Sequence, residues 1–250
     1  MATPQGPPGQ AHYGVDAPYV PAGFLLGAVV AGVLAVLVTL GQGAANAIGL
    51  WVVAALALLG AATYLHTTWR GKFAVWSRVL DDLGLQGSED ALDMGCGRGA
   101  VLLALARRLP TGHVTGLDLW RSRDQSGNEI DTTRANAVAE GVVDRVELVT
   151  GDMTSMPFPD GRFDLVVSSL AIHNIHGGED RMAAIDEALR VLRPGGRLVI
   201  ADIQATRLYA RRLRERGVDH VRHRRLGPQA WWSGPWMATS LVRADLPGAR

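Results

Sequence analysis

Charged side chains are absent from residues 17–69 of this 250-residue chain. Within that segment, two apolar stretches of residues 20–40 and 47–65 are joined by the short linker GQGAANA. A helix that crosses a bilayer needs ~20 apolar residues, and a buried helical hairpin of a soluble protein seldom has two such stretches without a charge. The sequence therefore predicts a two-helix transmembrane hairpin over residues 20–69 that contacts membrane lipid.

Lysine and arginine are also absent before the first apolar stretch, which argues against a cleaved signal peptide. Residues 1–19 are rich in Pro, Gly and Ala, a composition typical of a disordered tail. The first positive charges, Arg70 and Lys72, follow the second stretch. Because positive residues favour the cytoplasmic side, we expect a multi-pass protein of the cell membrane whose catalytic domain is cytoplasmic.

Cysteine is nearly absent, and neither sign of charge dominates. A single cysteine, Cys96, excludes an internal disulfide and a Cys-rich zinc site, and we predict no metal. From Arg70 onward the chain holds all 25 Lys and Arg residues and all of the 24 Asp and Glu residues except Asp16. This balance gives no electrostatic footprint for nucleic acid. Cys96 is either a nucleophile or a small residue in a crowded turn, and we favour the second interpretation.

Apolar segments of two periodicities follow the uncharged segment. Residues 70–87 predict an amphipathic lead-in helix and a linker, with Phe73, Trp76 and Leu80 at helical spacing. Residues 88–250 then predict one domain in which strands alternate with helices, the pattern of a parallel sheet. The strands are expected at 90–94, 113–118, 145–151, 163–169, 196–203, 219–226 and 237–246. The last two have no helix between them, so the fold class is α/β, Rossmann-like, with a seven-stranded mostly parallel sheet and an antiparallel C-terminal hairpin.

A glycine-rich turn follows the first of these strands, where an open α/β sheet binds its ligand. Gly95 and Gly97 also fit the spacing of dinucleotide-binding turns, so the glycines alone decide nothing. Asp93, two residues earlier, would repel a pyrophosphate but would attract the ammonium and sulfonium groups of S-adenosylmethionine. Asp118, which ends the second strand, could accept hydrogen bonds from the ribose hydroxyls of either NAD or S-adenosylmethionine.

A third polar position, Asp152, follows the third strand. Its carboxylate could accept a hydrogen bond from an adenine amino group, and Met153 could pack against the ring. Taken alone, these two residues fit equally well with a polar turn beside a core methionine.

In this order and spacing, the motifs resemble those of class I S-adenosylmethionine-dependent methyltransferases, over about residues 88–203. The small-molecule members related to quinone biosynthesis are the most similar. The resemblance implies that Asp93, Gly95 and Gly97 line the methionine end of the cofactor, while Asp118 holds the ribose. It further implies that Leu119 lies beside the adenine and that Asp152 and Met153 contact it. Ser169 and Leu170, which leave the fourth strand, would pass close to the reacting centre. The link after Asp118 is longer than usual, and its Trp120 either covers the adenine or packs on the surface.

Candidate acceptor-side residues lie just past the fourth strand. His173 is the leading candidate for a general base, and Asn174 could orient an acceptor hydroxyl. A structural hydrogen bond to a neighbouring loop is an equally good interpretation of His173. Near the chain end, the segment WWSGPW offers Trp231, Trp232 and Trp236 for an apolar acceptor pocket or a membrane surface, or for packing over the sheet edge.

Three hypotheses of function follow. The first is a membrane-anchored methyltransferase that acts on a small acceptor, either lipid-like or quinone-like. The second is a membrane-anchored NAD(P)-dependent oxidoreductase, which Asp93 and the motifs of the fourth and fifth strands disfavour. The third is a non-catalytic cofactor-binding module recruited by the hairpin.

Overall fold

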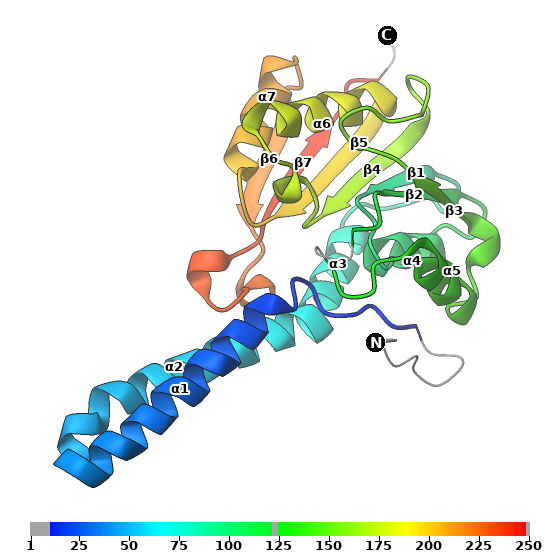
Figure 1. Cartoon of the computed structure of the whole chain (residues 1–250). Coiled ribbons are helices and arrows are strands. Elements are labelled where there is room, and N and C mark those ends of the chain that lie inside the picture. The colour runs from blue at the N-terminus through cyan, green and yellow to red at the C-terminus, as the bar shows by residue number, and fades with distance from the viewer. Residues whose placement is uncertain (1–10, 122–124, 249–250) are drawn as a thin grey trace.

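The computed structural model describes residues 11–121 and 125–248, which form an α/β domain and a projecting pair of helices (Figure 1). Helix α1 (Tyr19–Gln42) and helix α2 (Ala44–His66) run side by side away from the domain. Both are long and apolar enough to cross a membrane. Their large apolar side chains are open to the surroundings, for example Leu40 at 80% and Leu59 at 62% exposure.

Helix α2 continues into the domain without a break in the chain path. One π-helical turn, η1 (Thr67–Gly71), leads into α3 (Lys72–Asp81), whose Val75, Trp76 and Leu80 are buried against the domain. Helix α3 thus lies within residues 70–87, and it packs on the domain. The root of the helical pair is thus joined to the domain through a continuous helical path.

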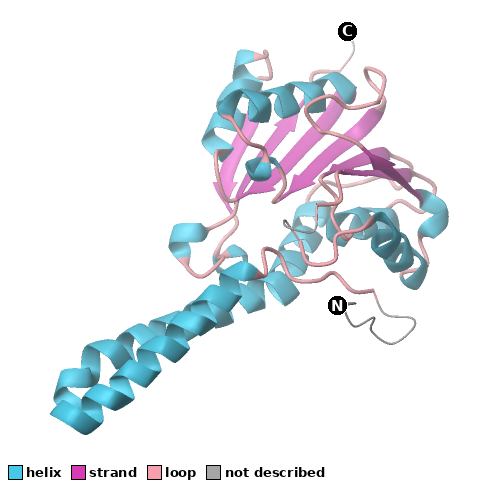
Figure 2. Ribbon diagram, viewed as in Figure 1, coloured by secondary structure: helices cyan, strands magenta, loops and turns pink. Residues whose placement is uncertain are grey.

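Seven strands form one sheet in the order β3-β2-β1-β4-β5-β7-β6 (Figure 2). In chain order they are β1 (Asp90–Met94), β2 (His113–Asp118), β3 (Val146–Thr150), β4 (Phe163–Ser169), β5 (Leu192–Asp202), β6 (His220–Arg225) and β7 (Ser240–Asp245). The first five are parallel, and β7 lies antiparallel between β5 and β6. The predicted sheet and its antiparallel end are confirmed.

Helices cover both faces of the sheet. They are α4 (Ala100–Arg108), α5 (Ile130–Ala139), α6 (Gly178–Val191) and α7 (Thr206–Glu215), with short helical turns η2 (Val143–Arg145), η3 (Ile172–Asn174), η4 (Pro228–Ala230) and η5 (Pro235–Met237). Because side chains alternate along a strand, Ala91 and Leu165 face α3 and α4, while Leu92 and Val166 face α6 and α7. Both strand faces are buried, which explains the continuous apolar runs in the sequence.

Residues 11–18, which we call the N-terminal strap, differ from the sequence-based expectation of a disordered tail over 1–19. His12 exchanges hydrogen bonds with the Asn136 side chain of α5 (2.8 and 3.0 Å), and the Tyr13 hydroxyl donates to Glu140 (2.8 Å). These side chains supply partners for a polar segment that has no apolar run of its own. Residues 1–10 lie outside the described part of the chain.

Candidate functional site

The glycine turn that follows β1 is closely packed between the ends of β2 and β4. Gly95 has a φ of +77°, and a Cβ atom there would lie 2.2 Å from that of Ala171. The Gly95 N–H donates to the carbonyl of Leu117 (2.7 Å), and the Gly97 N–H donates to the Asp118 carboxylate (2.9 Å). The turn therefore needs glycine, and it lies directly beside the Asp118 carboxylate.

Asp93 lies in the sheet, opposite Gly116 of β2 and Val167 of β4, and is only 1% exposed. Its Oδ1 has no hydrogen-bond partner among the described residues. Burial, with a further contribution from the charge of Asp118, raises the pKa of Asp93 to about 8. A cation bound at the turn would favour the ionised carboxylate through the low-dielectric interior, so the turn fits the ammonium and sulfonium of S-adenosylmethionine.

Cys96 is buried within the same turn, where its Sγ would lie 2.8 Å from a Cβ placed at Gly116. Burial and the nearby acidic side chains raise the pKa of its thiol. A thiol held protonated in this way is a poor nucleophile, which supports the interpretation of Cys96 as a small packing residue.

The Asp118 carboxylate is shared among several donors at the end of β2. Besides Gly97, it accepts hydrogen bonds from the Trp120 N–H (2.6 Å) and from Asn128 Nδ2 (3.2 Å). The Trp120 indole extends to the end of β3, where it donates to Thr150 Oγ1 (2.8 Å). Leu119, beside it, is exposed. Trp120 thus bridges the ends of the two strands between which the adenine was expected.

Asp152 and Met153 follow β3 but have different surroundings. Asp152 is exposed, and its Oδ1 accepts hydrogen bonds from the backbone and hydroxyl of Thr154 (both 2.8 Å). Met153 is closer to the turn, since its Cε lies 3.1 Å from a Cβ placed at Gly95. The structure therefore brings Met153 to the glycine turn and leaves Asp152 capping its own loop.

His173 forms a pair with a buried carboxylate that the sequence analysis did not identify. Its Nδ1 lies 2.5 Å from Asp202 Oδ1 at the end of β5, and its backbone N–H donates to Asp202 Oδ2 (3.1 Å). An Nδ1–H that donates to the carboxylate leaves Nε2 as the basic nitrogen. Asn174 Nδ2 donates to the carbonyl of Leu170 at 3.4 Å. The pairing serves both interpretations of His173, as a general base and as a structural link.

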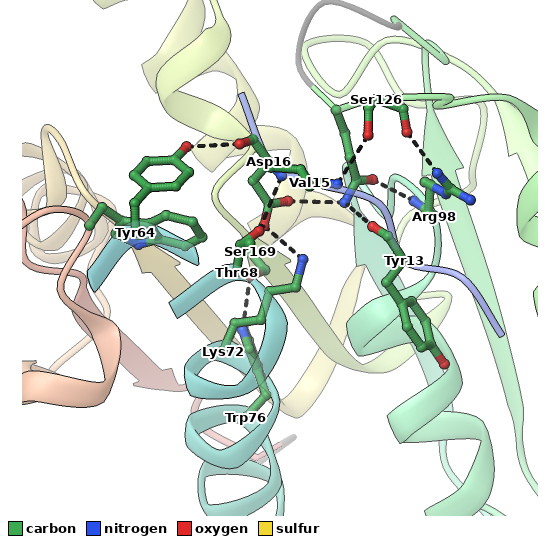
Figure 3. A network of polar contacts seen from close by, with 12 residues as sticks. Tyr13, Val15, Asp16, Tyr64, Thr68, Lys72, Trp76, Arg98, Ser126 and Ser169 are labelled. Atoms are coloured by element: carbon green, nitrogen blue, oxygen red, sulfur yellow. Dashed lines mark hydrogen bonds and ion pairs between the residues drawn. The ribbon is translucent and has the colours of Figure 1, made fainter. Parts of the chain in front are cut away.

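The strap is linked to the glycine turn through Gln125. Figure 3 shows the strap residues Tyr13, Val15 and Asp16 in one network of polar contacts with Arg98 of that turn. Gln125 Nε2 donates to the Tyr13 carbonyl (3.0 Å) and to Asp16 Oδ1 (2.9 Å), while its Oε1 accepts from the Arg98 N–H (2.9 Å). The same Oε1 lies 2.6 Å from a Cβ placed at Gly97. This link is missing from the sequence analysis because Gln125 lies outside every motif and the strap is distant in sequence.

A cleft lies between the root of the helical pair and the ends of β4 and β5. We call it the hairpin-root cleft. It is lined by Thr67, Lys72, Val75, Trp76, Ser169, Leu170, Ala201, Leu226, Ala230, Trp232 and Thr239. Trp76 Nε1 donates to Ser169 Oγ (2.8 Å), which joins α3 to the end of β4 (Figure 3). The cleft therefore opens beside Ser169 and Leu170, the two residues expected near the reacting centre.

The three C-terminal tryptophans have separate environments. Trp232 is buried in the cleft wall, where its ring meets that of Tyr64 edge-on at 5.0 Å. Trp231 is tied to η1, because Thr67 Oγ1 donates to its carbonyl (2.6 Å). Trp236 is 76% exposed. Pocket lining and surface exposure thus both occur within one loop.

No group of three or more His, Cys, Asp or Glu side chains that could hold a metal ion occurs in residues 11–121 and 125–248.

Comparison with known proteins covers the part of the chain that contains the turn. Residues 92–200 match the family model described as a methyltransferase domain. Demethylmenaquinone methyltransferases of Staphylococcus aureus, among them those of strains Newman and COL, are 35% identical over 135 residues. That region is 54% of this chain and 48% of theirs, so the chain spans about half the length of the curated relatives it matches.

Solved structures share the fold. Geranyl diphosphate C-methyltransferase from Streptomyces coelicolor superposes with a TM-score of 0.54 at 18% identity, over 69% of this chain and 78% of that chain. The cyclase SpnF superposes with a TM-score of 0.55 at 20% identity, over 69% of this chain and 81% of that chain. A methyltransferase and a cyclase therefore have the same architecture, and the fold alone does not determine the reaction.

Proposed function

We propose that this chain, whose residues 92–200 match a methyltransferase domain, is a membrane-anchored, S-adenosylmethionine-dependent methyltransferase. Its acceptor would be a small lipid-like or quinone-like molecule at the cytoplasmic face of the membrane. The observation that carries the reaction class is the buried, unpaired Asp93 oxygen beneath a glycine turn that also holds Asp118. That pair of carboxylates suits a ligand with a cationic end and a ribose.

The cofactor-binding residues that we propose are Asp93, Gly95, Gly97, Asp118, Leu119, Asp152, Met153 and Ser169. Asp93 would act on the cationic end across the turn, since its side chain is buried. Asp118 would exchange its bond with the Gly97 N–H for bonds to ribose hydroxyls. Met153 and Trp120 supply apolar surface at the strand ends, where an adenine would stack.

S-adenosylmethionine, when bound, supplies a methyl group on a cationic sulfur, so the chain mainly aligns the acceptor and excludes water. An acceptor hydroxyl or amine must also lose a proton. We propose that His173 Nε2 accepts that proton. Asp202, paired with Nδ1, would hold the ring in its orientation and stabilise the imidazolium that forms. Asn174, one residue later, would orient the acceptor.

Membrane anchoring is supported by the exposure of the helical pair. Apolar side chains cover α1 and α2 on their outer faces, and large exposed apolar surfaces mark contacts with a membrane or a protein. Tyr19 and Trp69 are exposed near the domain end of the pair, as interfacial aromatics would be. Arg70 follows Trp69 directly, and its positive charge favours a cytoplasmic location for the domain end of the pair.

Methyl transfer is tested with the full-length chain in lipid nanodiscs and S-adenosylmethionine that carries tritium in its methyl group. With a lipid extract as acceptor, we expect tritium in the organic-soluble fraction, in an amount that H173N and D202N lower. Consumption of NADH by the same preparation, with no tritium in the organic fraction, would favour the oxidoreductase hypothesis.

A further inference from the structure

Lys72 is the only lysine of the chain, and its side chain is 8% exposed. It lies at the start of α3, where it lines the hairpin-root cleft and a second cavity between α3 and α4. Trp76 and Ser169 line both cavities as well. One buried ammonium group therefore lies where the two cavities meet, beside the end of β4.

The Lys72 ammonium has one hydrogen-bond partner among the described residues, Asp16 Oδ2 at 2.7 Å (Figure 3). An ammonium group carries three N–H donors, so two are available to a ligand. Asp16 does not depend on Lys72 alone, because it also accepts from Thr68 Oγ1 (2.5 Å) and Gln125 Nε2 (2.9 Å). Lys72 can thus turn a donor toward the cleft while Asp16 keeps two other partners.

The remaining cleft wall is mainly apolar. Val75, Leu170 and Trp232 contribute aliphatic and aromatic surface, and the Trp76 indole N–H is already bonded to Ser169. An apolar wall around one ammonium group with N–H donors to spare selects a ligand with an apolar body and a single anionic oxygen, because an N–H donor on a cation forms its strongest hydrogen bond with an ionised acceptor. A second cation or a strongly polar ligand would be disfavoured there.

We propose that the hairpin-root cleft is the acceptor site and that Lys72 binds an anionic oxygen of the acceptor, such as a phenolate, enolate or carboxylate. This inference rests on the proposed function and adds the acceptor's chemical class to it. The cleft lies against Thr67 and Trp232 at the root of the hairpin, so an apolar acceptor reaches it from the bilayer side. The ammonium group stabilises the acceptor as an anion, the form that attacks a methyl carbon most readily.

Because Lys72 is unique, labelling with ¹⁵N-lysine gives one side-chain resonance in the full-length chain. The chain in nanodiscs is titrated with 2-naphthoate, a carboxylate anion at pH 7, and with 2-naphthamide, an uncharged molecule of nearly the same shape. We expect 2-naphthoate to shift the Lys72 resonance and to bind at least tenfold more tightly than the amide. Equal affinities, or a resonance that naphthoate leaves unmoved, would overturn the proposal.

Three variants separate the charge of Lys72 from its structural role. K72R should keep the preference for the anion, whereas K72M should reduce it to about equal affinities. The double variant K72M/D16N removes both charges, so it also loses the preference without a buried unpaired carboxylate. S-adenosylhomocysteine is titrated into every sample: if it binds and naphthoate shows no preference, only the acceptor inference fails. If naphthoate shows the preference and S-adenosylhomocysteine does not bind, the proposed methyl transfer fails instead.

Discussion

Asp93 gives a quantitative prediction about cofactor binding. With a pKa of about 8, its carboxyl group is about nine-tenths protonated in the free protein at pH 7. A cationic ligand at the turn favours the ionised form, so binding lowers this pKa and releases the proton. We therefore expect about 0.9 proton released per S-adenosylhomocysteine bound at pH 7, whose ammonium group supplies the cation.

The same linkage fixes how affinity depends on pH. Between the lowered pKa of Asp93 in the complex and its pKa in the free protein, each unit of pH should change the dissociation constant for S-adenosylhomocysteine by about tenfold, with tighter binding at higher pH. Titration calorimetry between pH 5.5 and 7.5, in two buffers of different ionisation enthalpy, measures both the slope and the released proton. D93N cannot ionise, so its affinity should be nearly independent of pH and its proton release close to zero.

D152N is the matched control, because Asp152 is exposed and makes its hydrogen bonds within its own loop. It should weaken binding without changing the slope. A wild-type slope near zero, or the same slope in D93N, would refute the assignment of the proton to Asp93.

Further predictions concern the turn, the acceptor side, the strap and acid stability. G95A should lower the melting temperature strongly, since its Cβ would overlap Ala171; G217A, also at positive φ but with open space around it, should cost only about 1 kcal/mol of unfolding free energy. D202N should lower kcat and shift its pH profile with little effect on binding of S-adenosylhomocysteine, because it changes how His173 is held. Q125A should speed cofactor dissociation in stopped-flow measurements, and an unchanged rate would mean that the strap does not retain the cofactor. Because the folded-state pKa of Asp93 is raised, its contribution to stability is fully present below about pH 4 and is lost as pH rises toward 8; D93N should remove that part of the pH dependence in denaturant unfolding.

The strands of the sheet were predictable because each one is indicated by a short apolar segment of its own sequence. The predicted bounds of β1, β2 and β4 agree with the structure to the residue, since strands buried on both faces carry apolar residues at neighbouring positions. The position of β7 between β5 and β6 follows from pairing rather than from any one segment, and the sequence indicated only an antiparallel end. The glycine turn and Asp118 were predictable together because parallel strands end at one edge of the sheet.

The contacts that complete the site were not predictable in this way. The strap has no apolar periodicity, and two of its partners, Asn136 and Gln125, are more than 100 residues away in sequence from the strap residues that they bond. Asp202 ends β5 without a motif around it, so its pairing with His173 depends on the twist and order of the strands. Lys72 was recognised as an orientation signal, but its burial beside Ser169 depends on how α3 packs.

The most direct test of the cofactor assignment is a pair of calorimetric titrations of the purified full-length chain. S-adenosylhomocysteine is expected to bind at one site per chain, and NADH at the same concentrations is expected to give no binding heat. Tight NADH binding together with no response to S-adenosylhomocysteine would contradict the assignment of the glycine turn to a cationic nucleoside.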